Sequence, residues 1–149
     1  MPTPTPTDID LTARTVWGEA RGEPDIGRLA VAWVIRNRAW VTPGWYGRGV
    51  EGCVDDSPAA VCLKRRQFSC WNADDPNRAL VEAVTADDPV FLGCLTIARG
   101  VLTDAAGFDV DPTGGATHYY AAWMDPPPAW ARDRDYLTIG GHRFLHRVA

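Results

Sequence analysis

The first part of the chain carries hydrophobic residues at intervals of three and four positions, which predicts two successive helices. The apolar face of the first helix consists of Ile9, Ala13, Val16, Trp17 and Ala20. Asp8 is suited to cap this helix, and Gly22 and Pro24 are suited to end it. The second helix starts at Asp25, and its apolar face consists of Ile26, Leu29, Ala30, Val31, Trp33, Val34 and Ile35. Because this second face is so wide, we expect that helix to lie at the centre of the fold.

Between Thr42 and Cys70 the helical period is lost, and glycine, proline, aspartate and cysteine predominate. This composition predicts a long irregular segment of the kind that carries binding residues. A third helix is predicted from Asp75-Pro76 and a fourth after Asp88-Pro89, since proline is favoured in the first turn of a helix. The apolar positions of the fourth helix are Phe91, Cys94, Leu95, Ala98, Val101 and Leu102. Gly107 closes the helical part.

After Gly107 the pattern changes to that of strands. Residues 117–123 are predicted to be extended, and residues 136–139 and 142–148 to form a hairpin around Gly140-Gly141. The predicted fold class is therefore α+β and mainly α, with a helical body and a small antiparallel sheet at its C-terminal end.

Length and composition predict one domain. The chain has 149 residues, of which 46% are hydrophobic, and this is enough for one core over residues 8–149. Residues 1–7 alternate proline and threonine and are predicted to be a disordered leader without the apolar segment of a secretory signal. A formal charge of -4 argues against nucleic-acid binding, and no apolar run is long enough for membrane insertion. We expect a monomer.

The four cysteines do not have the spacing of a metal site. Cys53, Cys62, Cys70 and Cys94 form no CxxC pair, so structural zinc is not expected. A disulfide between Cys62 and Cys70 is open on spacing alone, and Cys94 is predicted to be a buried thiol on a helix. No other cofactor is indicated.

Glu19 and Glu23 place two carboxyl groups four residues apart where the first helix ends. The negative end of the helix dipole disfavours ionisation of Glu19, and a nearby Glu23 would add like-charge repulsion. Both effects raise the pKa of the carboxyl group, as a general acid near neutral pH requires. The alternative is a solvated helix end, in which Arg14 or Arg21 pairs with Glu19 and cancels the shift.

Two short clusters combine polar and aromatic side chains. Gln67-Phe68-Ser69-Cys70-Trp71 and Thr117-His118-Tyr119-Tyr120 offer amide, hydroxyl and imidazole groups beside rings, a combination that suits a sugar. Four tryptophans in predicted loops could add stacking surface, namely Trp45, Trp71, Trp123 and Trp130. Trp17 and Trp33 are instead predicted to fill the core. Each cluster taken alone also fits ordinary turn and core residues.

Two other site chemistries fit less well. His142, His146 and His118 could hold zinc as in an amidase, but positions four apart on a strand hold the two rings too far apart. Cys62 or Cys70 could serve a thiol peptidase together with His118, although neither cysteine is placed clearly at a helix N-terminus.

Several motifs taken together resemble a known family. These are Trp17 to Pro24, Ala30 to Ala32, Asn37-Arg38, Gln67 to Trp71, Ala116 to Tyr120 and Ile139 to Phe144. In this order they are similar to the cell wall hydrolases typified by bacterial spore cortex-lytic enzymes, from about Leu11 to Phe144.

The resemblance implies a lysozyme-like fold and cleavage of peptidoglycan glycan strands between N-acetylmuramic acid and N-acetylglucosamine, most often as a lytic transglycosylase. Glu19 matches the catalytic glutamate, which would act as general acid and then as base. The residues implied for the substrate groove are Gln67, Phe68, Ser69, Trp71, His118, Tyr119 and Tyr120. Glu23 is expected to hold the turn or orient the site.

Two alternatives accompany this hypothesis. A hydrolysing muramidase would need a second carboxylate, for which Glu23 and Asp125 are candidates. A non-catalytic wall-binding module would keep the aromatic groove without using the acid. Because the sequence shows neither a secretion signal nor a wall-binding domain, we expect a phage endolysin-like protein that is made in the cytoplasm and reaches the wall or periplasm through a separate membrane pore.

Overall fold

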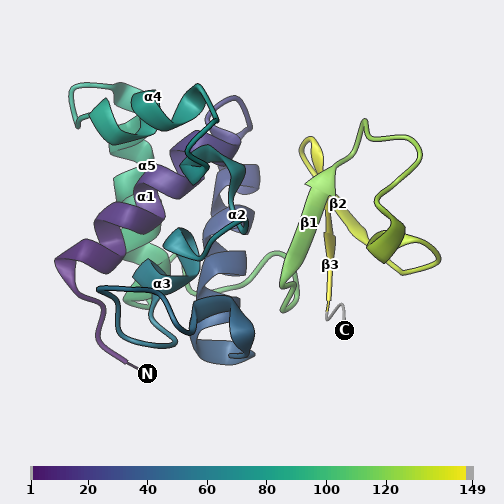
Figure 1. Cartoon of the computed structure of the whole chain (residues 1–149), viewed down its shortest axis with the longest axis horizontal. Helices are drawn as coiled ribbons and strands as arrows, with labels where there is room; N and C mark the ends of the chain where they lie inside the picture. The colour runs from purple at the N-terminus through teal and green to yellow at the C-terminus, as the bar shows by residue number, and fades with distance from the viewer. Residues whose placement is uncertain (1, 147–149) are drawn as a thin grey trace.

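A helical body and a three-stranded sheet lie side by side in the computed structural model, which describes residues 2–146 (Figure 1). The α-helices are α1 (Pro6–Ala20), α2 (Asp25–Arg36), α3 (Pro58–Leu63), α4 (Asn77–Ala83) and α5 (Pro89–Leu102). The shorter helical turns are the π-helical η1 (Asn37–Val41) and the 3-10 turns η2 (Trp45–Gly47), η3 (Ser69–Trp71) and η4 (Ala129–Ala131). The strands are β1 (His118–Ala121), β2 (Leu137–Ile139) and β3 (His142–Leu145). The predicted mainly helical α+β fold class is confirmed.

Helix α1 begins at Pro6, and its cap lies three residues before the predicted cap, Asp8. Its cap is Thr5, whose hydroxyl accepts from the backbone N–H of Asp8, while the Asp8 carboxylate accepts from the Thr5 N–H at 2.9 Å. Asp8 also accepts from the N–H of Ala59 at 3.1 Å and so joins α1 to the start of α3. The last two residues of the predicted leader are therefore helical, and Met1 lies outside the described residues.

The core lies between α1, α2 and α5. Figure 1 shows α1 and α5 lying against each other, and α2 between them and the sheet. Residues 30–35 of α2 are all buried, so the predicted central position of this helix is confirmed. Trp17 and Trp33 are core residues as predicted, and the Trp33 indole N–H donates to the Phe108 carbonyl at 3.1 Å.

The segment from Thr42 to Cys70, predicted to be irregular, contains the short helix α3. Its cap is Ser57, whose hydroxyl accepts from the Ala60 N–H at 3.1 Å, and Pro58 occupies the first turn. The predicted third and fourth helices are confirmed as α4 and α5.

The sheet is antiparallel, with β3 between β1 and β2. Tyr119 of β1 pairs with Phe144 of β3, and both side chains face the helical body. The next residues along these strands, Tyr120 and Leu145, pack on the opposite face against Ala131. Strand β3 ends at Leu145, before the predicted end at residue 148; residues 147–149 lie outside the described residues.

All four cysteines are free thiols, so Cys62 and Cys70 do not form a disulfide. Cys94 is fully buried on α5, as predicted. A bilayer-crossing helix is not found between residues 2 and 146, because each helix there is too short or too polar.

Candidate active site

Glu19 lies in the last turn of α1, where its half-buried carboxyl group is held from two sides. The Tyr119 hydroxyl on β1 donates to Oε1 at 3.0 Å, and the Ser69 hydroxyl on η3 donates to Oε2 at 3.4 Å. Ser69 and Tyr119 are 50 and 100 residues away from Glu19 in the sequence. The carboxyl group therefore sits where the helical body meets the sheet.

Gly18 explains how η3 comes so close to α1. A Cβ atom at this position would lie 2.8 Å from the Cβ of Cys70 and 2.8 Å from a methyl carbon of Val81, which is closer than side chains can pack. The Trp71 indole of η3 donates to the Thr15 hydroxyl at 2.9 Å, and the Asn77 amide at the start of α4 donates to the Gly18 carbonyl at 3.0 Å. A residue without a side chain thus lets η3 cover the carboxyl group.

The pKa of Glu19 is raised above its ordinary value, and the main cause is burial. Hydrogen bonds from Tyr119, Cys70 and Ser69 favour the charged form and oppose this shift. The causes predicted from the sequence were the helix dipole and repulsion by Glu23. Repulsion by Glu23 is not among the causes of the shift, because the Glu23 carboxylate is directed to another partner, the N–H of Gly141. The contribution of the helix dipole stays a prediction.

Neither arginine that could have neutralised Glu19 contacts it. Arg14 pairs with Asp10 and donates to backbone carbonyls at the end of α4. The Arg21 guanidinium donates to Asn77 at 2.7 Å and lies over the Trp17 ring. The acid is therefore free to hold a proton.

Tyr119 presents a neutral hydroxyl to the acid. Burial and the adjacent Glu19 raise the pKa of Tyr119 well above its ordinary value, so the phenol stays protonated. It can donate to Glu19 throughout the physiological pH range.

Arg38, which sequence reasoning did not assign to the site, is buried behind the groove residues. Its guanidinium donates to the Thr117 carbonyl at 2.6 Å and to the Gln67 side chain at 3.3 Å. It also lies over the Tyr46 and Phe68 rings, at 5.1 and 5.3 Å from their centroids. One side chain thus ties β1, η2 and the segment before η3 together. The signal in the sequence was an arginine beside the apolar run of α2.

Glu23 connects the end of α1 to the hairpin. Its carboxylate accepts from the N–H of Gly141 in the turn between β2 and β3 and lies 3.6 Å from Nδ1 of His142. A Cβ atom at Gly141 would lie 2.9 Å from the Glu23 carboxylate, so glycine is needed for this contact. This position suits the predicted role of holding the turn.

The residues predicted for the groove are only partly brought together. Ser69 and Tyr119 contact Glu19, and Gln67 and Phe68 reach the same region through Arg38. Phe68 is fully buried and therefore supports the groove from below.

Three predicted groove residues lie elsewhere. Tyr120 faces away from Glu19, because alternate residues of a strand point to opposite faces, and its ring is buried against Ala131. The Trp71 indole is directed to Thr15 in the body. His118 lies on the same side of β1 as Tyr120, and burial, followed by Arg38, lowers its pKa to about 4, so the imidazole is neutral.

The rings of Trp45, Tyr46, His118 and Trp130 form a continuous aromatic row beside the site. Successive centroids are 4.8, 5.8 and 5.4 Å apart. The end members Trp45 and Trp130 are 55% and 38% exposed, whereas Tyr46 is buried between them and the body. The exposed indole rings at the two ends of the row offer flat apolar surface to a ligand.

A family model described as Cell Wall Hydrolase matches residues 22–145, which is most of the chain. This chain belongs to the cell wall hydrolase family. The match starts just after Glu19, so the acid itself lies next to the matched range rather than within it. The family predicted from the sequence motifs is confirmed.

Curated relatives of this cell wall hydrolase include spore cortex-lytic enzymes. The enzyme of Halalkalibacterium halodurans is 35% identical over 145 residues, covering 93% of this chain and 34% of that protein. The enzyme of Bacillus cereus is 35% identical over 82 residues, covering 55% of this chain and 31% of that protein. The chain thus spans about a third of the length of these relatives.

Solved structures show that the hydrolase has the fold of a catalytic domain. The catalytic domain of the Bacillus cereus SleB protein has a TM-score of 0.67 at 27% identity, covering 97% of this chain and 94% of that one. The catalytic domain of the germination-specific lytic transglycosylase SleB from Bacillus anthracis has a TM-score of 0.63 at 27% identity, with 95% of each chain covered.

The histidines considered as zinc ligands do not come together in the described part of this hydrolase. The three histidines have separate partners: His118 contacts Thr117, His142 lies by Glu23, and His146 lies by the Thr113 carbonyl. Between residues 2 and 146 no three His, Cys, Asp or Glu side chains are grouped as metal ligands.

A thiol nucleophile is also unsuited to the site. Burial raises the pKa of Cys62 to about 12 and raises that of Cys70 further, so neither forms a thiolate near neutral pH.

Proposed function

We propose that this cell wall hydrolase cleaves the glycan strand of peptidoglycan between N-acetylmuramic acid and N-acetylglucosamine, as a lytic transglycosylase with Glu19 as both acid and base. The observation that carries the proposal is a half-buried carboxyl group with a raised pKa, two hydroxyl donors and no basic partner. The family membership and the SleB-like fold support the choice of substrate.

In the first step, protonated Glu19 donates its proton to the glycosidic oxygen. The bond between that oxygen and C1 of the muramoyl residue breaks, leaving an oxocarbenium-like centre on C1 and a carboxylate on Glu19. Tyr119 and Ser69 donate to this carboxylate, so the charge that forms in the step has partners already in place.

In the second step, the Glu19 carboxylate removes the proton from the 6-hydroxyl of the same muramoyl residue. The 6-oxygen then bonds to C1 and closes a 1,6-anhydro ring, which returns the proton to Glu19 without consuming water. One carboxyl group suffices for both steps.

Among residues 2–146 no second carboxylate is found to act on Glu19, and this favours the transglycosylase course over hydrolysis. Glu23 accepts a hydrogen bond from Gly141. Asp125 is exposed in the connection after β1, where its charge helps to raise the pKa of Arg143. Neither candidate is positioned on Glu19, whereas a muramidase would need one to activate water or stabilise C1.

The aromatic row is suited to hold the sugars. Exposed indole rings at Trp45 and Trp130 can stack on pyranose faces, while Gln67 offers an amide to hydroxyl or acetamido groups.

The decisive test is Glu19→Gln, which keeps the shape of the side chain and removes its proton chemistry. We expect this variant to keep its fold by circular dichroism and to lose lysis of purified sacculi by at least about a thousandfold. The matched control is Glu51→Gln, an exposed glutamate in the loop before α3. Lysis by the Glu19 variant at the parental rate would refute the role of the acid.

The products distinguish the two cleavage reactions. Mass spectrometry of released fragments is expected to show 1,6-anhydromuramoyl ends, which are lighter by one water than reducing ends. Reducing ends instead would identify a muramidase, and binding to sacculi without any soluble fragments would identify a wall-binding module.

A further inference from the structure

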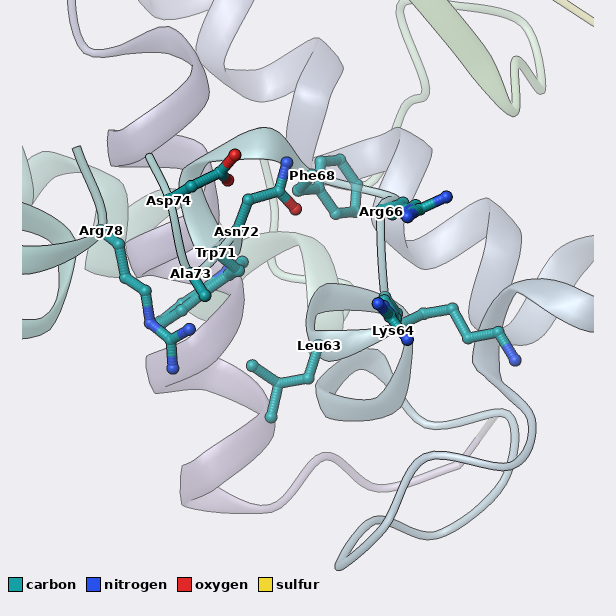
Figure 2. Close-up of a pocket in the computed structure, with 10 residues that line it drawn as sticks. Leu63, Lys64, Arg66, Phe68, Trp71, Asn72, Ala73, Asp74 and Arg78 are labelled. Atoms are coloured by element: carbon teal, nitrogen blue, oxygen red, sulfur yellow. The ribbon is translucent and has the colours of Figure 1, made fainter. Parts of the chain in front are cut away.

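A pocket of about 770 Å³ lies between the end of α3 and the start of α4 (Figure 2). Its lining includes four basic side chains, Lys64, Arg65, Arg66 and Arg78, and one acidic side chain, Asp74. The whole chain has 15 basic and 19 acidic residues, so this pocket concentrates positive charge on an acidic protein.

Three of these charged side chains have no partner in the described part of the chain. Arg65, Arg66 and Asp74 make no hydrogen bond or ion pair within residues 2–146. The two others are already engaged. Lys64 donates to the Arg48 carbonyl and is turned aside in Figure 2, and Arg78 pairs with Glu82 at 2.6 Å.

The backbone at Arg66 is in an unfavourable conformation. Its φ angle is 65°, in the left-handed region that residues other than glycine, asparagine and aspartate rarely adopt. Such outliers persist only where the surrounding structure holds them in place, and they cluster at ligand-binding sites.

The basic side chains lie on two sides of the pocket. Figure 2 shows Arg78 at one side and Arg66 at the other, with Trp71 and Asn72 between them. A ligand that spans the pocket therefore meets the unpaired Arg66 on one side and Arg78, in its exposed pair with Glu82, on the other, an arrangement that suits a chain with more than one carboxylate. The Asp74 carboxylate offers a partner for an ammonium group on the same ligand.

The pocket is adjacent to the acid along the chain. Phe68 and Trp71 line it, and Ser69 between them donates to Glu19. A glycan strand lying on Glu19 has peptide stems attached to its muramoyl residues, and these stems carry free carboxylates and often one free amine.

We infer that the pocket formed by Arg65, Arg66, Arg78 and Asp74 binds the peptide stem of the glycan strand through its carboxylate and ammonium groups. This inference rests on the proposed function, because the strand must first lie on Glu19. A polyphosphate such as a teichoic acid would use the arginines but would be repelled by Asp74, so the peptide fits the charge pattern better.

The test compares two substrates: glycan strands with intact stems, and the same strands after an amidase has removed the stems. For Arg65→Gln/Arg66→Gln we expect the KM on stem-bearing strands to rise about tenfold with little change in kcat, since two exposed charge pairs are lost. On stem-free strands the variant and the parent have equal KM values. The control is Arg99→Gln/Arg132→Gln, which removes the same charge from exposed arginines outside the pocket.

A binding measurement separates this inference from the proposed function. The Glu19→Gln protein, which cannot cleave, is sedimented with stem-bearing and with stem-free sacculi. We expect the double substitution at Arg65 and Arg66 to lower its affinity about tenfold for stem-bearing sacculi alone.

Equal losses on both substrates, or no loss on either, would overturn the stem site even if the parent cleaves both. A loss that depends on teichoic acids, and not on stems, would assign the pocket to polyphosphate instead. A parent that cleaves neither substrate, while binding still depends on stems, would refute the proposed function and support the pocket.

Discussion

Replacing Tyr119 by phenylalanine removes a single oxygen atom from the surroundings of Glu19. That hydroxyl donates to Oε1 at 3.0 Å and opposes the effect of burial on the pKa of Glu19. A hydrogen bond to a charged group contributes about 1.5–3 kcal/mol, and one pKa unit corresponds to about 1.4 kcal/mol. Because the carboxyl group is only half-buried, we take the lower end and expect the pKa of Glu19 to rise by about one unit.

The assay is the pH dependence of kcat/KM on purified glycan strands. The first step needs protonated Glu19, so activity falls as the pH rises through the pKa of this group in the free enzyme. In Tyr119→Phe this alkaline limb moves to higher pH by about one unit. The maximal rate falls about tenfold, because the carboxylate that forms in the transition state has lost a donor.

Tyr136→Phe is the matched control, since Tyr136 is exposed over Arg143 and outside the site. Titration of the Glu19 carboxyl carbon by NMR measures the same shift without substrate. An alkaline limb at the parental pH, or displaced to lower pH, would refute the assignment of Glu19 as the acid held by Tyr119.

Three further substitutions test the surroundings of the site. Gly18→Ala places a carbon 2.8 Å from the Cβ of Cys70, so we expect urea denaturation to show a loss of about 1–3 kcal/mol together with weaker lysis; parental stability would contradict the close packing. Glu23→Gln weakens the bond to Gly141 and is expected to lower stability by about 1 kcal/mol without moving the pH profile of activity, whereas a displaced profile would show that this residue acts on the acid. Glu19→Gln removes a carboxyl group whose pKa is raised in the folded protein, so the variant is expected to be more stable than the parent at pH 7. This gain disappears as the pH falls below the ordinary pKa of 4.5, where the carboxyl group is protonated in both the folded and the unfolded protein. A gain of equal size at all pH values would be evidence against a buried acid.

Local patterns predicted the helices and strands well because their signals lie within a few residues of each other. Hydrophobic residues spaced three and four positions apart predicted α1, α2 and α5, and Gly140-Gly141 predicted the hairpin turn. Helix α3 was not predicted, because the composition of its segment favoured a loop. Its start is nevertheless marked in the sequence by the capping residue Ser57 followed by Pro58. The start of α1 was displaced for a similar reason, since Thr5 with Pro6 forms the actual cap.

The site was harder to predict because its chemistry depends on residues far apart in the sequence. Glu19 could be singled out from its own segment, yet its pKa is raised by the burial that η3 and β1 produce. Strand alternation indicates that Tyr119 and Tyr120 face opposite ways, but only the packed structure shows which of them faces the acid. The predicted monomeric state and the route to the wall through a separate pore stay predictions.

The carboxyl group of Glu19 has its raised pKa only while the sheet rests on the helical body. Its Oε1 partner belongs to β1, and the hairpin is fastened to the body through Glu23 and Gly141. When this contact between the hairpin and the helical body opens, water reaches Glu19. The pKa of its carboxyl group then falls to that of a free glutamate, and most molecules are ionised at neutral pH. Warming that opens this contact should therefore abolish lysis while the helices are still intact.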